Sequence, residues 1–176
     1  MAYFFDLVLQ DTYIPGRYVY ETSDGLEWNL VIEAPMGNII ITETLDTTNT
    51  VIGITEEKTA GEILAFGDIV YFAADGKAYK ADASPTITPP DKYPAMAMAA
   101  GTIGANQRGS FLLWGTARND TWNWTIGGVL YLSTTAGGMT QTPPNATDEV
   151  IQVLGVGHPN PDTIYFRPSV DYITST

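Results

Sequence analysis

The sequence predicts an all-β protein, a small antiparallel β-barrel or β-sandwich built from repeated β-hairpin units, with an N-terminal extension. Two observations predict this fold class. Short apolar and aromatic runs recur between clusters of Gly, Pro, Asn and Asp, and helical periodicity is nearly absent. A five-residue run beginning at Gly16, Gly67 and Gly127 ends each time in Tyr and is followed by a glycine turn. Self-similarity at a period of about 50 to 60 residues is typical of one supersecondary unit used several times.

Each copy of this pattern predicts a hairpin followed by a small-residue apolar strand and then by one further strand. The second and third copies agree best, whereas the first is interrupted by an insertion around residues 27–50. The alternative is that any all-β chain repeats apolar runs and turns by chance. The predicted strands, in chain order, are 3–9, 17–20, 28–33, 39–43, 51–54, 62–66, 69–73, 77–80, 95–99, 110–115, 129–132, 139–141, 150–156 and 163–167.

The segment 82–94 is predicted to be a long connector. It carries Pro85, Pro89, Pro90 and Pro94, and prolines at this density favour extended backbone without ladder hydrogen bonds. We expect two parts in the chain. Residues 1–60 would form an N-terminal arm with the irregular first β unit, and residues 61–176 a barrel or sandwich domain with two repeated hairpin units.

The charge of the chain excludes several classes of partner. Eight basic residues against 20 acidic ones give a net charge of −12, so we expect no binding to nucleic acid or to an anionic membrane. Charged residues make up 16% of the chain, below the roughly 25% of average soluble domains. Such a surface suits a protein packed against other subunits, or equally a plain β domain with a Thr-rich surface. The N-terminus lacks the basic region of a signal peptide.

The sequence offers no anchor for catalysis, so an enzyme is not predicted. Cysteine is absent, and the single histidine, His158, lies in a proline-flanked turn. The adjacent carboxylates Glu56 and Glu57, and likewise Asp148 and Glu149, would point to opposite faces of a strand and therefore do not converge. No metal or cofactor motif is present, and no cofactor is expected.

Two groups of apolar residues are candidate interface residues. Trp122 and Trp124, spaced by two, would share one face of a strand, where they could stack on a sugar, fill a subunit interface or cap the barrel core. The second group is an N-terminal arm that would dock on a neighbour, or else form the first strand of the protein's own sheet. The residues of this arm are Tyr3, Phe4, Phe5 and Leu7.

Residues 62–172 resemble β modules of tailed-bacteriophage virion proteins, found in head decoration (cement) proteins and in C-terminal domains of tail fibres. The segments that carry the resemblance are 67–71, 75–77, 80–82, 94–99, 115–125, 127–134, 139–144, 150–157 and 164–169. The resemblance implies a small non-catalytic β module, commonly a homotrimer. The chain departs from the fibre pattern because it lacks a long repetitive shaft, which favours cement.

The function expected from this resemblance is a capsid cement protein on the outer capsid surface of the virion. It would bind the major capsid protein, bridge neighbouring capsid subunits and stabilise the shell. The alternative is a tail-fibre or tail-tip adhesion module that binds a host glycan through Trp122 and Trp124 or through the connector 82–94. A hydrolase of unknown type is a third, less favoured hypothesis.

Overall fold

The protein is described by a computed structural model, which covers the backbone of residues 17–23 and 27–33 and, in full, residues 45, 47–85 and 93–176. The chain divides into two compact units, Met1–Ile40 and Ile41–Thr176. In the first unit, β1 (Arg17–Ser23) and β2 (Glu27–Glu33) form an antiparallel hairpin, which confirms the first predicted hairpin. The predicted strands 3–9 and 39–43 lie outside the described residues.

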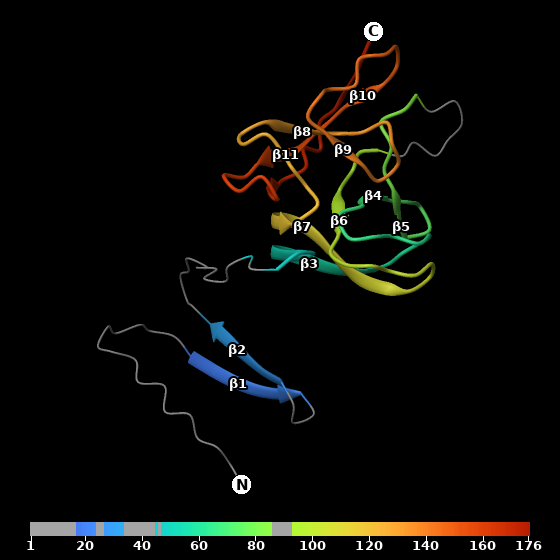
Figure 1. Ribbon diagram of the computed structural model, residues 1–176. Coiled ribbons are helices and arrows are strands. Elements are labelled where there is room, and N and C mark those ends of the chain that lie inside the picture. Colours follow the sequence, from blue (N-terminus) through green and yellow to red (C-terminus); the bar gives the residue numbers. More distant parts are fainter. Residues whose placement is uncertain (1–16, 24–26, 34–44, 46, 86–92) are drawn as a thin grey trace. The chain divides into compact units, whose positions relative to one another are not determined.

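The second unit is built on one nine-stranded antiparallel sheet that is strongly curled into a half-barrel, so the predicted all-β fold class is confirmed (Figure 1). Eight strands follow the order β5-β4-β6-β7-β12-β11-β8-β9, and β3 pairs with β7 beside this path. The strands are β3 (Thr50–Thr59), β4 (Ile69–Phe72), β5 (Ala78–Lys80), β6 (Ala97–Ala99), β7 (Arg108–Arg118), β8 (Val129–Leu132), β9 (Met139–Thr140), β11 (Val153–Gly157) and β12 (Thr163–Phe166).

The strand order of this sheet contains the same four-strand arrangement twice, joined through its last strands. The first repeat consists of β4–β7, and the second repeat consists of β8, β9, β11 and β12. In the first repeat, β6 pairs with β4, the first strand of the hairpin β4–β5, and β7 pairs with β6. In the second repeat, β11 pairs with β8, the first strand of the hairpin β8–β9, and β12 pairs with β11. The last strands, β7 and β12, pair with each other at the middle of the sheet. The predicted repetition of the second and third copies is therefore present in the topology.

The first predicted copy does not follow this arrangement. Its third strand, β3, pairs along its whole length with β7 of the first repeat (Figure 1). Its predicted fourth strand, 62–66, is not a strand, because Leu64 makes only an isolated bridge and the Asp68 carboxylate accepts a hydrogen bond from the Ala65 amide in a turn. The division between units therefore falls near residue 40 rather than at residue 60, since β3 belongs to the second unit.

The predicted strand 150–156 is divided in two at a buried glutamine. β10 (Val150–Ile151) pairs with β13 (Ile173–Thr174), a strand that was not predicted, whereas β11 pairs with β8 and β12. Between them, the fully buried Gln152 side chain accepts a hydrogen bond from the Ala95 amide and donates to the Ala95 carbonyl. The amide side chain thus takes the place of a strand partner and ties the two repeats together.

The buried residues form two separate clusters on opposite faces of the sheet. The main core lines the inner face and takes residues from both repeats, among them Met98, Leu112, Leu130 and Ile164. The second core covers the outer face of the first repeat only. It consists of Ala60, Leu64, Val70, Ala78, Ala97, Ala99, Ile103 and Phe111.

The connectors complete the description of the fold. At the two described ends of the predicted connector, 82–85 and 93–94, the backbone forms no strand, as expected, and the part between them lies outside the described residues. Within the described residues, no helix has the length and apolar character needed to cross a membrane.

Candidate interaction surface

Five exposed apolar or aromatic side chains lie in a row across the outer face of the sheet. One comes from each of the neighbouring strands β3, β7, β12, β11 and β8, and their exposed fractions range from 36% to 55%. We call this row the outer stripe. It consists of Ile54, Trp114, Tyr165, Val156 and Val129.

The strand register places these side chains next to one another. Ile54 lies opposite Trp114, Tyr165 lies opposite Val156, and Val156 lies opposite Val129. Tyr165 is also directly opposite Thr116, which stands two residues from Trp114 on β7. Diagonal neighbours of this kind are within reach of aromatic side chains. The outer stripe is therefore one continuous surface rather than five scattered residues.

The outer stripe is exposed because the layer that covers the first repeat ends before Trp114 on β7 and has no counterpart in the second repeat. In the first repeat, outward-facing residues such as Val70 and Phe111 are buried under Leu64 and Ile103, which come from the connectors before β4 and before β7. In the second repeat, the link between β11 and β12 is only the short turn 158–162, and the outward-facing residues stay exposed. A contiguous exposed apolar surface of this kind is characteristic of an interaction site.

The chemistry of the outer stripe is uncharged and partly aromatic. Of its flanking residues, Ile52, Thr116, Tyr131 and Val153 carry no charge, and Glu56 and Arg167 place a charge at its border. The His158 ring lies 4.7 Å from the Tyr165 ring, and its Nδ1 accepts a hydrogen bond from the Asn160 amide. The single histidine thus orders a turn and supports Tyr165. The composition matches the core of protein interfaces, which are poor in charge and rich in aromatic residues.

Trp122 and Trp124 are in a different place from the one predicted. The segment 119–128 is not a strand, so the prediction that both residues lie on one strand face is wrong. Their rings lie 6.1 Å apart, and both are half-buried against the main core, with Trp122 also 6.1 Å from Phe66. The Trp122 amide is held by the Asn119 carbonyl and the Trp124 amide by the Pro161 carbonyl. The two side chains cap the main core, which is one of the roles that the sequence allows for them.

The remaining candidate residues do not converge on a site. Tyr3, Phe4, Phe5 and Leu7 lie outside the described residues. Glu56 forms an ion pair of 2.7 Å with Lys58, and Glu149 accepts hydrogen bonds from the Asn145 and Ala146 amides. Among the residues that the structure describes, no group of three or more metal-ligating side chains gathers.

None of the five residues of the outer stripe is in the predicted set of interface residues. Their strands are apolar on both faces, as in 111–114 and 164–166, and such runs do not show which residues face outward. The usable signal would have been the length of the connectors, because the covering layer of the first repeat is made from them.

No protein-family model, curated protein or solved structure matches this chain.

Proposed function

We propose that this chain is a virion structural protein, a cement protein that decorates the outer surface of a bacteriophage capsid. The observation that carries the proposal is the outer stripe, a continuous uncharged surface left bare where the corresponding face of the first repeat is buried. A sheet face of this composition needs a protein partner to remove it from water. In the proposal, this partner is the major capsid protein.

The mechanism of shell stabilisation is interface burial. Trp114 and Tyr165 are the anchors of the contact, because large aromatic side chains supply most of the binding free energy at an interface centre. A standard interface buries about 1,600 Å² in total. As a homotrimer, the arrangement that the resemblance implies, the protein would present three copies of each contact, so that modest single contacts give strong overall binding. The net charge of −12 fits a partner other than nucleic acid or an anionic membrane.

The N-terminal arm is proposed as a second contact with a neighbouring subunit. Tyr3, Phe4, Phe5 and Leu7 are apolar residues within a stretch of nine that carries one charge, Asp6. Deletion of residues 1–9 should reduce the number of copies bound per shell. Unchanged occupancy after this deletion would remove the arm from the proposal.

The first test is the location of the chain on virions that contain it. An antibody against the chain, viewed by electron microscopy, should label the whole head at many copies. Label confined to the tail would contradict a cement function.

The second test is rebinding of purified protein to shells that lack it. Val156→Lys places a charge in the middle of the outer stripe and should reduce occupancy at least tenfold. Val170→Lys is the matched control, because Val170 is 76% exposed and lies outside the outer stripe. Equal occupancy for both variants would exclude the outer stripe as the capsid contact.

A second candidate function is glycan binding by a tail-fibre or tail-tip adhesion module. One observation favours it: Trp114 and Tyr165 are exposed aromatic rings on the same sheet face, and such rings can stack on sugars. Trp124, by contrast, is half-buried against the core. A glycan array should then show binding that is lost in Trp114→Ala, whereas absence of any bound glycan would leave the cement function.

A further inference from the structure

β3 is a long edge strand with one open side. Its ten residues pair with β7 over the whole length, and among the described residues no strand pairs with the other edge. The half from Thr50 to Ile54 carries no charge, and the Ile54 side chain is 55% exposed. Proteins normally protect such edges with charges, bulges or a covering segment, because unpaired backbone groups recruit another strand.

The backbone groups that point to the open edge can be assigned from close contacts in the ladder. A Cβ atom on Gly115 would lie 2.1 Å from the Ile52 carbonyl oxygen, and one on Gly53 would lie 2.1 Å from the Trp114 carbonyl oxygen. The Ile52 carbonyl therefore points toward β7. Because amide direction alternates along a strand, Val51, Gly53 and Thr55 direct their N–H and C=O groups to the open edge.

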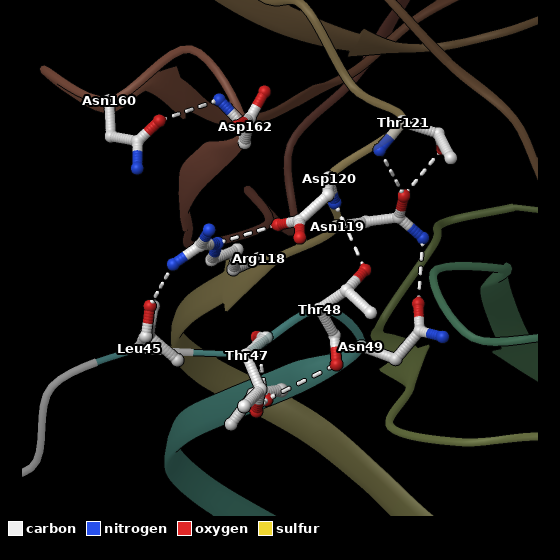
Figure 2. A network of polar contacts seen from close by, with 11 residues as sticks. Leu45, Thr47, Thr48, Asn49, Arg118, Asn119, Asp120, Thr121, Asn160 and Asp162 are labelled. Atoms are coloured by element: carbon white, nitrogen blue, oxygen red, sulfur yellow. Dashed lines mark hydrogen bonds and ion pairs between the residues drawn. The ribbon is translucent and has the colours of Figure 1, made fainter.

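The start of this edge is held in place by a polar network (Figure 2). The Asp120 amide donates to the Thr48 hydroxyl at 3.0 Å, and the Asn119 side chain donates to the Asn49 side chain at 2.7 Å. The Arg118 guanidinium pairs with Asp120 at 2.7 Å and also donates to the Leu45 carbonyl. These contacts fix the N-terminal end of β3 on the C-terminal end of β7, so the open edge is ordered before any partner arrives.

We propose that the open edge of β3 pairs antiparallel with the same edge of a second copy of the chain, centred on Gly53. In this register Gly53 faces Gly53 of the second copy, Ile52 faces Ile54, Val51 faces Thr55, and Thr50 faces Glu56. The three residues that direct their backbone groups outward then pair only with one another. The contact is isologous, so one edge serves both partners.

Charge permits this register between two copies of the chain. Centred on Gly53, the pairing sets Glu56 opposite an uncharged threonine and brings no like charges face to face. The uncharged half of β3 is thus a place where two copies, each with a net charge of −12, can approach closely.

The pairing also joins the outer stripes of the two copies into one. The two-fold axis is perpendicular to the sheet, so both outer faces point the same way and Ile52 of one copy lies beside Ile54 of the other. This two-fold contact differs from the three-fold contact implied by the resemblance, and it does not depend on the proposed capsid function.

Disulfide cross-linking tests the register directly, because the chain contains no cysteine. Ile52 and Ile54 of the second copy form a non-hydrogen-bonded pair, with Cα atoms about 4.5 Å apart, close enough for a disulfide. Two Ile52 residues, or two Ile54 residues, are diagonal neighbours about 7–8 Å apart, too far for an unstrained bond. Under mild oxidation, a mixture of Ile52→Cys and Ile54→Cys protein should form dimers at least tenfold faster than either variant alone. Equal rates in all three samples, or no dimer in the mixture, would overturn the proposal.

Native mass spectrometry of the full chain provides a second readout. The unmodified protein should show dimers whose fraction rises with concentration, and Ile54→Lys should abolish them. Ile63→Lys is the control for an added charge, because Ile63 is 69% exposed and lies outside β3. Dimers that survive in Ile54→Lys would also contradict the proposed edge.

Discussion

The two repeats of the sheet share one strand order and differ in what covers their outer faces. In the first repeat, β6 is buried on both faces, because the segments around Leu64 and Ile103 form a second core over it. In the second repeat, the corresponding strand β11 buries Leu154 on one face and exposes Val156 on the other. The same arrangement of strands thus gives a closed structural half and a half with an open apolar face.

The difference shows that connectors, rather than strands, decide where this protein can bind. Both repeats present apolar residues outward, at Phe111 on β7 and at Tyr165 on β12. Only in the first repeat do the connectors supply Leu64 and Ile103 as partners for those residues. An outward-facing apolar residue without such a partner within the described unit is available to another molecule.

The largest difference expected from this comparison is in the free energy of unfolding lost when Phe111 or Tyr165 is replaced. Phe111 is fully buried in the second core, so Phe111→Ala should lower the free energy of unfolding by about 3–5 kcal/mol. Tyr165 is 45% exposed, and Tyr165→Ala should cost less than about 1 kcal/mol. Urea unfolding followed by circular dichroism measures both. Equal losses would mean that the two outer faces are buried to the same degree.

The next effect concerns two glutamines that make the same reciprocal bonds in different surroundings. Gln152 pairs with the Ala95 amide and carbonyl in the interior, and Gln141 pairs in the same way with Thr125 where water has access. Gln152→Leu leaves buried backbone groups unsatisfied and should lower the free energy of unfolding by about 2 kcal/mol. Gln141→Leu should cost less than about 1 kcal/mol, because water replaces the lost bonds. The same urea titrations provide the values, and a cost for Gln141→Leu as large as that for Gln152→Leu would contradict this account.

The smallest expected effect is a pH dependence of stability that the hairpin turn of the first repeat has and that of the second repeat lacks. In the first repeat, the Asp75 carboxylate accepts hydrogen bonds from the Lys77 amide and the Tyr79 hydroxyl, which lower the pKa of Asp75 and raise that of Tyr79. The turn of the second repeat, 134–138, has no carboxylate. Because the folded-state pKa of Asp75 is lowered, its stabilisation is present above the unfolded pKa and is lost as pH falls through the folded one.

This prediction is checked by an NMR titration of the Asp75 carboxyl and by the pH dependence of unfolding in Asp75→Asn. The variant should lose part of the acid-dependent change in stability seen in the unmodified chain. An Asp75 pKa at or above the ordinary value for an aspartate would show that the turn is not ordered as described.

The sequence was sufficient for the fold class and for the repeated hairpins, because turn glycines such as Gly76 and Gly137 have positive φ and mark each hairpin. It also located the strands after the second and third hairpins, apart from the interruption at Gln152. That interruption depends on a side chain reaching Ala95, 57 residues earlier in the chain, which no local pattern can show.

The candidate surface could not be predicted from local sequence. Exposure of Trp114 and Tyr165 depends on which connectors cover which face, a long-range property, while Trp122 and Trp124 have the local spacing of a platform and instead pack on the main core. The pairing of β3 with β7 joins segments 64 residues apart at Ile52 and Thr116, and it placed β3 in the second unit against expectation. Strand pairings at such separations follow from packing rather than from propensity.

The central claim is that the outer stripe is covered by a partner in the assembled particle. Hydroxyl-radical footprinting of the free chain and of virions that contain it measures this face directly. Trp114 and Tyr165 should be oxidised in the free chain and protected in the virion, whereas buried Phe111 should be protected in both. Equal oxidation of Trp114 and Tyr165 in the two samples would contradict the claim.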